Sequence, residues 1–280
     1  MRSLGNLAGA IAAVTIIAVV LGILGPSEAL GQATPAQGTK AQDEKPPPPA
    51  APSPWSFRLS PYLWLAGIDG KVGVRSNLPS LNVDVGFSDI FDAIDWFPPP
   101  VMMSGEVRYG RFGFVSDFIY LGLEDSGGRT RGPISATADV KLNAAIWTFG
   151  GSYRVIENDP VTLDLLAGGR VWGMDVKAKL TGPLAVRQGS GNQTWVDPII
   201  GIAGRVELGS GFALQAEGDV GGFGLVSDID WQVVGTLQYQ INDSISMDAG
   251  YRYLAVDYKN GGFLFDAALS GPIIGATFRF

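Results

Sequence analysis

The residues that could carry chemistry are charged side chains placed at alternate positions along apolar segments. Glu217 and Asp219 form one pair of carboxylates, and Glu106 and Asp117 form a second. Paired carboxylates can perform general acid–base catalysis where a cleft and a reacting group lie beside them. The chain has no histidine and no cysteine, which excludes imidazole ligands, thiolate nucleophiles and Ser–His mechanisms. We therefore predict no catalytic residues and interpret these carboxylates as members of ion pairs.

A larger set of charged residues shares one face of the alternating segments, and we predict that this face lines the lumen of a barrel. Burying an unpaired charge is unfavourable, so these side chains must form ion pairs or stay hydrated. They either fill the lumen or line a narrow channel that selects small solutes, and a barrel of about ten strands favours the filled lumen. The candidate lumen-lining residues are Arg58, Glu106, Arg108, Asp117, Asp164, Arg170, Arg205, Glu207, Glu217, Asp219, Asp248, Arg252 and Arg279.

An acidic segment offers a candidate loop gate. Asp89, Asp92 and Asp95 follow Ser88, a residue type that often caps a helix. On the polar side of a short helix these carboxylates could gate the barrel mouth, attract cations or contact a ligand. The alternative is a rigid lid that packs on the barrel rim. The aspartate spacing does not match an EF-hand calcium loop, so we predict no metal site and no cofactor.

The end of the chain shows the pattern that predicts the fold. Phe278 and Phe280 share one face of the last segment, while Arg279 lies on the other. Segments of about ten residues with this alternation, and with aromatic residues near their ends, are typical of transmembrane β-strands. About ten such segments predict an all-β, closed antiparallel transmembrane β-barrel. Eight or twelve strands remain alternatives, because residues 71–75 and 81–87 could form a further hairpin.

Turn-forming residues order these segments into hairpins. Short turns and long loops alternate, as the periplasmic turns and external loops of outer-membrane barrels do. The short turns are predicted at residues 110–113, 157–160, 209–211 and 242–244. The longer connections are predicted at residues 68–100, 124–134, 178–196, 224–228 and 259–263.

The N-terminal part has the composition of an export signal followed by a tether. Residues 1–31 contain a positive start, an apolar run and small residues suited to cleavage after Ala29 or Gly31. An uncleaved transmembrane anchor is the alternative, since the run is nearly long enough to span a bilayer. Residues 32–54 are rich in proline and alanine, which predicts a disordered periplasmic linker. The barrel is then expected over residues 55–280.

The overall composition excludes several classes of function. The net charge is −7 and no block of basic residues exists, which argues against binding to nucleic acid. Glycine is frequent, at 39 residues, and only 17% of residues are charged. A glycine-rich, weakly charged chain with 46% hydrophobic residues suits closely packed strands with an apolar outer surface.

Several short motifs in the second part of the chain are characteristic: Pro61-Tyr62-Leu63-Trp64, Phe87-Ser88-Asp89-Ile90-Phe91, Glu106-Val107-Arg108-Tyr109-Gly110, Asp117-Phe118-Ile119-Tyr120-Leu121, Gly250-Tyr251-Arg252-Tyr253-Leu254 and Phe278-Arg279-Phe280. With them, the segment from Trp55 to Phe280 resembles an uncharacterised family of Gram-negative outer-membrane β-barrels in the porin-like and opacity-protein-like superfamily. The resemblance implies insertion by the outer-membrane assembly machinery, which reads a C-terminal aromatic residue such as Phe280. It implies no activity and no binding site.

Two functional hypotheses follow from these observations. The first is a non-enzymatic barrel of the outer membrane, in contact with lipid and lipopolysaccharide, that has a structural role or passes small solutes. The second is a surface recognition or adhesion protein that binds through its external loops. Outer-membrane enzymes of similar size use histidine, which this chain lacks, so we do not expect an enzyme.

Overall fold

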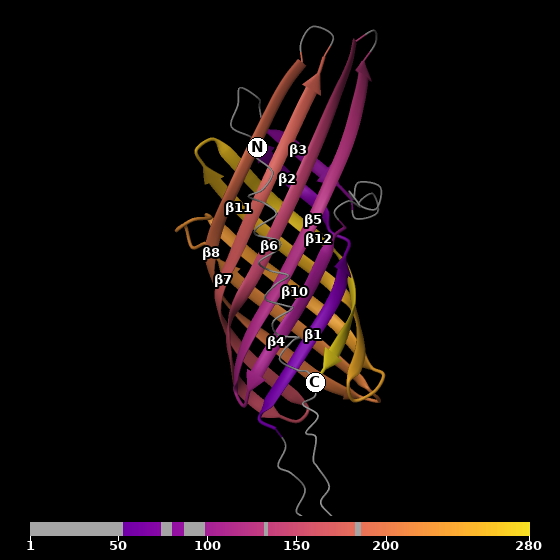
Figure 1. Ribbon diagram of the computed structural model, residues 1–280, viewed down its shortest axis with the longest axis vertical. Coiled ribbons are helices and arrows are strands. Elements are labelled where there is room, and N and C mark those ends of the chain that lie inside the picture. Colours follow the sequence, from indigo (N-terminus) through magenta and orange to yellow (C-terminus); the bar gives the residue numbers. More distant parts are fainter. Residues whose placement is uncertain (1–52, 74–79, 87–98, 132–133, 183–185) are drawn as a thin grey trace, which may run out of the picture. The chain divides into compact units, whose positions relative to one another are not determined.

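The computed structural model describes residues 53–280, apart from 74–79, 87–98, 132–133 and 183–185 (Figure 1). The chain divides into two units, Met1–Ala51 and Pro52–Phe280. The first unit, which contains the predicted signal peptide and most of the predicted linker, lies outside the described residues. The predictions for those segments therefore stay predictions.

The described part of the second unit is built from β-strands. No described helix is long and apolar enough to cross a membrane. The strands are β1 (Trp55–Trp64), β2 (Gly67–Gly73), β3 (Leu81–Val85), β4 (Val101–Tyr109), β5 (Phe112–Arg131), β6 (Ile134–Asn158), β7 (Val161–Thr181), β8 (Val186–Gly209), β9 (Phe212–Gly221), β10 (Ile229–Gln240), β11 (Ile245–Asn260) and β12 (Phe263–Arg279).

Ten of these strands close into an antiparallel barrel. From β4 to β12 each strand pairs with the next strand in the chain, and β1 pairs with β4 on one side. On its other side β1 pairs with β12, where Arg58 lies opposite Arg279 and Leu63 opposite Ile274. This pairing closes the sheet on itself and confirms the predicted all-β, closed antiparallel barrel with ten strands.

The other two strands form a hairpin on the barrel wall. β2 continues along β12 where β1 ends, and β3 pairs with β2, with Lys71 opposite Asn82. Between β1 and β2 the chain passes so close to β12 that a Cβ atom on Gly271 would lie 1.8 Å from the Leu65 carbonyl oxygen. The hairpin begins at Gly67 and otherwise lies within residues 68–100, which the sequence predicted as one long loop with a hairpin as the alternative.

The two ends of the barrel differ in the length of their connections. At the end where β1 begins and β12 stops, here called the terminal end, tight turns join β4 to β5, β6 to β7, β8 to β9 and β10 to β11. At the opposite end, here called the far end, strands β5 to β8 run well beyond the rest of the wall (Figure 1). The tight turns occupy the predicted positions.

The projecting strands correct two of the predicted loops. β5, β6, β7 and β8 contain 20, 25, 21 and 24 residues, whereas about 9–11 residues suffice for a strand to cross a bilayer. Residues 124–134 and 178–196 are mostly strand, so the prediction of long connections there was wrong. These segments are rich in glycine and polar residues and lack the apolar alternation that identifies a lipid-facing strand. A four-stranded sheet extends from the barrel instead.

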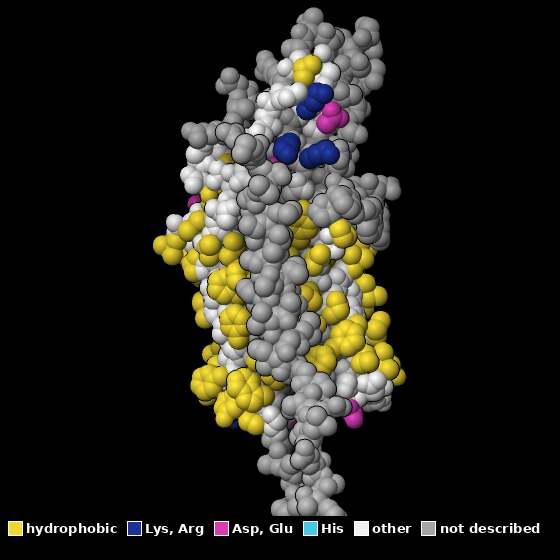
Figure 2. Space-filling view, in the orientation of Figure 1, with side chains coloured by type: hydrophobic (Ala, Val, Ile, Leu, Met, Phe, Trp, Pro, Cys, Tyr) yellow, Lys and Arg dark blue, Asp and Glu magenta, His cyan; other side chains and the backbone are white. Residues whose placement is uncertain are grey.

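The outer surface of the barrel is apolar. Large side chains such as Leu165, Ile200 and Val233 are about half exposed. Hydrophobic side chains gather in a broad band on the face of the barrel that Figure 2 shows. Aromatic residues ring the terminal end, where Trp55 packs on Tyr109 with ring centroids 4.9 Å apart. Further exposed aromatic residues on this end are Phe112, Tyr153, Phe212, Tyr239 and Phe280. An exposed apolar band with an aromatic border is the surface of a lipid-facing barrel.

The interior of the barrel has two parts of opposite character. Toward the terminal end the inward residues are charged or polar and surround a cavity; this part is called the hydrated half. Toward the far end the inward residues are apolar and buried; this part is called the apolar half. Its main members are Trp172, Met174, Val176, Trp195, Leu254, Val256, Tyr258, Phe263, Phe265, Ala267 and Leu269.

Candidate functional site

The hydrated half holds a cavity of about 260 Å³ to which each of the ten barrel strands contributes at least one residue. Side chains alternate between the two faces of a strand, so every second residue of each strand points into this space. The Arg58 side chain is 34% exposed and Asp117 is 20% exposed, whereas Arg252 and Arg170, which lie deeper, are 3% and 0% exposed. The cavity therefore opens at the terminal end and closes toward the middle of the barrel.

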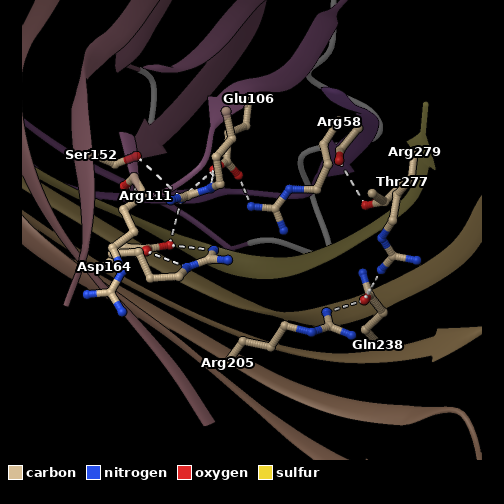
Figure 3. A network of polar contacts seen from close by, with 12 residues as sticks. Arg58, Glu106, Arg111, Ser152, Asp164, Arg205, Gln238, Thr277 and Arg279 are labelled. Atoms are coloured by element: carbon tan, nitrogen blue, oxygen red, sulfur yellow. Dashed lines mark hydrogen bonds and ion pairs between the residues drawn. The ribbon is translucent and has the colours of Figure 1, made fainter. Parts of the chain in front are cut away.

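A chain of alternating charges follows one side of the cavity (Figure 3). Glu106 forms ion pairs with Arg58 and with Arg108. Arg108 Nη2 lies 2.8 Å from Asp164 Oδ2, and Arg154 Nε lies 2.9 Å from Asp164 Oδ1. Three arginines thus share two carboxylates across four strands, and each carboxylate forms ion pairs with two guanidinium groups.

A second group adjoins the first at the same end, where β12 pairs with β1 (Figure 3). Gln238 Oε1 accepts hydrogen bonds from both Arg205 and Arg279. Gln238 Nε2 donates to Asp248 Oδ1 at 2.6 Å, and Thr277 Oγ1 donates to Asp248 Oδ2 at 2.7 Å. Here two guanidinium groups share a neutral oxygen, whereas the first group uses carboxylates.

Deeper in the barrel a third group surrounds Arg252. Arg252 Nη1 lies 2.7 Å from Asp117 Oδ2, and Tyr62 donates its hydroxyl proton to Asp117 Oδ1 at 2.6 Å. Arg252 Nη2 donates to Gln232 Oε1 at 2.7 Å, and Gln232 Nε2 donates to Glu217 at 3.2 Å. The guanidinium group also lies 4.9 Å from the ring centroid of Trp64, where the apolar half begins.

Arg170 marks the boundary between the two halves. Its Nη1 lies 2.6 Å from Asp230 Oδ1, its Nη2 lies 2.8 Å from Asp219 Oδ2, and its Nε donates to Thr148 at 2.9 Å. Trp172 Nε1 donates to Asp230 Oδ2 at 3.0 Å, which ties the ion pairs to the apolar half above. The side chains of Arg170, Asp219 and Asp230 are at most 1% exposed, and they extend into the interior from β7, β9 and β10.

Aromatic rings fill the space beyond that layer. Trp172 and Trp195 stack with centroids 5.7 Å apart, and Trp195 stacks on Tyr258 at 3.9 Å. Phe263 and Phe265 pack against the same rings from β12. Because these side chains come from strands on opposite walls, they join the walls through a core packed like that of a soluble protein.

The structure places the predicted lumen residues on the inward face in three groups. Eight of them line the cavity directly: Arg58, Glu106, Arg108, Asp117, Asp164, Glu217, Asp248 and Arg252. Arg205, Glu207 and Arg279 lie at its terminal end, with Glu207 about half exposed, while Arg170 and Asp219 lie in the buried boundary layer. Asp89, Asp92 and Asp95 lie outside the described residues, so the candidate gate is not described.

Sequence reasoning missed several residues that complete these groups. Arg154, Asp230 and Gln238 share the inward face with residues that were predicted to face the lumen, and the same alternation would have found them. The aromatic residues of the apolar half were missed because apolar residues were assigned to the lipid face. The sequence did contain the information, because Leu254 and Tyr258 lie an even number of residues after Arg252 in the same strand and therefore share its inward face.

The chemistry of the cavity is that of charge pairing and solvation. The described residues contain no group of three acidic side chains that could hold a metal ion. Neither carboxylate pair of the sequence forms an isolated acid–base couple: Glu106 and Asp117 each bind arginine, and Asp219 binds Arg170. The arrangement can hold water and bind small polar molecules through guanidinium, carboxylate and amide groups.

Known proteins share the fold of this chain but not its sequence. No family model matches the chain, and no curated protein matches its sequence. The outer membrane protease OmpT from Escherichia coli is similar in structure with a TM-score of 0.53 at 11% identity, covering 81% of this chain and 96% of that protein. The attachment invasion locus protein Ail of Yersinia pestis matches with a TM-score of 0.30 at 16% identity, covering 81% and 99%. The likeness to OmpT shows that this chain has the fold of an outer-membrane β-barrel, as the sequence predicted.

Proposed function

We propose that the protein is a non-enzymatic, integral β-barrel of the Gram-negative outer membrane whose lumen does not conduct solutes from end to end. In this proposal the terminal end faces the periplasm, reached by a cleaved signal peptide and a linker, and the far end faces outward. The apolar band contacts lipid and lipopolysaccharide, and the assembly machinery reads the exposed aromatic ring of Phe280. The barrel then has a structural role in the envelope.

The observation that carries this proposal is the continuous barrier across the barrel interior. Arg170, Asp219 and Asp230 form a layer with no solvent access, and Trp172 and Leu254 behind it are equally buried. Moving an ion through packed apolar side chains would require its dehydration without compensating ligands, which is highly unfavourable. A barrel of ten strands is also narrow enough for side chains to fill it, since about eight strands already leave room for little else.

The absence of enzymatic activity is supported by the sequence as well as by the cavity. The whole chain lacks histidine and cysteine, the residues most often used as general base and as activated nucleophile. In the described cavity wall the carboxylates of Asp117 and Asp164 are neutralised by arginine. Such carboxylates serve as counter-ions and are poor proton acceptors.

Conductance in planar lipid bilayers tests the closed lumen. The refolded full-length protein is expected to insert without discrete openings, while the double variant Trp172→Ala/Trp195→Ala should show leak currents because it empties the aromatic layer. Trp147→Ala, which removes an outward-facing tryptophan of β6, is the matched control and should remain silent. Discrete openings of the wild-type protein would contradict the proposal and favour the narrow channel.

One observation favours surface recognition as a second candidate function. Beyond Tyr120, β5 pairs only with β6, and before Ile199, β8 pairs only with β7, within the described strands. Among the described residues the four-stranded sheet therefore has two strand edges with no partner strand, and such edges can accept a further strand. Cells that display the wild-type protein should bind an immobilised host protein or polymer, and shortening the β5–β6 and β7–β8 hairpins should abolish binding. Unchanged binding by the shortened variant would reject this role.

A further inference from the structure

Two arginines lie directly opposite each other where the barrel closes. Arg58 of β1 pairs in register with Arg279 of β12, and both side chains point into the hydrated half (Figure 3). Like charges in directly opposed positions destabilise an antiparallel pair of strands. Arg58 has a counter-ion in Glu106, but no ion pair between described residues includes Arg279. The closure of the barrel thus brings two arginines together, and only Arg58 has a carboxylate directly paired with it among the described residues.

A third arginine shares a hydrogen-bond acceptor with Arg279. Arg205 of β8 and Arg279 both donate to the side-chain oxygen of Gln238, so two positive charges meet at one neutral acceptor. The carboxylate that Arg205 does bind, Glu207, is about half exposed and therefore weakly effective as a counter-ion. Arg279 donates through Nη2 in the bonds between described residues, which leaves Nε and Nη1 available to another acceptor.

We propose that Arg58, Arg205 and Arg279, here called the seam arginines, bind a small oxyanion such as phosphate or the carboxylate of an organic acid. Guanidinium groups bind these anions through short, charge-assisted and often bidentate hydrogen bonds. An anion between the three groups would offset the Arg58–Arg279 repulsion and replace the neutral Gln238 as acceptor. The adjoining cavity of about 260 Å³ has room for the remainder of such a ligand.

The position of the site determines how a ligand reaches it. The seam arginines lie at the terminal end, where exposure of the interior is highest, while the layer around Arg170 has no solvent access. The anion therefore enters and leaves at the terminal end. This inference does not depend on the proposed closed lumen, because binding at the mouth needs no passage through the barrel.

Titration of the refolded full-length protein in detergent micelles tests the site. Inorganic phosphate, and separately citrate, is added at constant ionic strength with chloride as the background anion, and heat of binding and thermal unfolding are recorded. We expect saturable binding of at least one of the two anions and a melting temperature that rises with its concentration. Absence of saturable binding for both anions would overturn the proposal.

The variant Arg279→Gln separates ligand binding from a purely structural role. Without the anion it should melt at the same or a higher temperature than the wild type, because the repulsion at the seam is removed. Its affinity for the anion should fall roughly 10- to 100-fold, the loss expected for a hydrogen bond to a charged group. The opposite pattern, a lower melting temperature with unchanged affinity, would show that Arg279 is a structural anchor and overturn the proposal.

Arg111→Gln is the matched control because Arg111 lies at the same end but pairs with Glu157 on an exposed turn. It removes the same charge from the protein without touching the seam. The control should leave the affinity for the anion unchanged. An equal loss of affinity in Arg279→Gln and Arg111→Gln would mean that anion binding depends only on the overall charge of the protein, which would also overturn the proposal.

Discussion

The two halves of the barrel interior are built from the same ten strands but are filled differently: one holds paired charges around a cavity, and the other holds closely packed apolar side chains. In the hydrated half, charges such as Asp164 and Arg108 pair beside a cavity that solvent reaches. In the apolar half, Trp172 and Leu254 exclude solvent completely. The same alternating wall can thus enclose a polar space or a hydrophobic core, and the inward residues alone decide which. Stability should therefore respond very differently to equivalent substitutions in the two halves.

The sharpest test of this contrast is at the boundary. Arg170→Met leaves Asp219 and Asp230 buried without a counter-ion, and the free energy of unfolding should fall by about 3–5 kcal/mol. Urea unfolding in lipid vesicles, followed by tryptophan fluorescence, measures this change. Adding Asp219→Asn and Asp230→Asn to the variant should recover most of the loss. A loss of less than about 1 kcal/mol in the single variant would show that water reaches this layer.

The apolar half should respond to cavities as a soluble core does. Leu254→Ala empties a fully buried position, and we expect the free energy of unfolding to fall by roughly 2–5 kcal/mol in the same urea experiment. The matched control is Leu237→Ala on the outer face of β10, where lipid chains can fill the space that the side chain leaves. Equal losses in the two variants would mean that the interior is loosely packed.

The hydrated half should tolerate the loss of a charge better than the boundary does. Asp164→Asn keeps the shape of the side chain but removes the charge that binds Arg108 and Arg154, for an expected loss of about 1–3 kcal/mol. Water that enters from the terminal end can solvate the released guanidinium groups. If the loss in the free energy of unfolding equals that of Arg170→Met, water does not solvate the hydrated half better than the boundary layer.

The smallest effect is expected outside the interior. Arg111 and Glu157 form an ion pair at 3.7 Å with side chains that are 53% and 48% exposed. Exposed pairs of this kind contribute little, so Arg111→Ala should change the free energy of unfolding by less than about 1 kcal/mol. A larger loss would indicate that the terminal end is held together by its surface charges as well as by the pairs inside.

The sequence predicted the wall of the barrel better than its ends or its contents. Alternation counted back from Phe280 correctly separated Met247 and Ile274, which face outward, from Ser246 and Thr277, which face inward. That pattern is reliable because lipid on one side imposes it on every strand. Where strands leave the bilayer the constraint disappears, and residues 124–134 and 178–196 therefore resembled loops although most of their described residues are in strands.

The candidate site was predictable residue by residue but not as a set of contacts. The alternation of residues along each strand placed Arg58, Arg170 and Arg279 on the inward face. It says nothing about which residues of distant strands they contact. Arg170 meets Asp230, which is 60 residues away, only because the barrel closes around them. Alternation could also place Gln238 on the inward face, but it could not show that Arg205 and Arg279 share the Gln238 side-chain oxygen, because the three residues lie on different strands.

The pairing of β1 with β12 has a consequence for how the chain folds. Ser60 and Thr277, whose hydroxyls are 2.8 Å apart, are separated by 217 residues along the chain, whereas each strand from β4 to β11 pairs with the strand that follows it in the sequence. Contacts of such long range form slowly because the intervening chain must first be ordered. Until the last strand is in place, β1 and β11 each present an unpaired edge. We therefore expect assembly to end with the joining of the first strand to the last, and a chain truncated before β12 to remain unclosed.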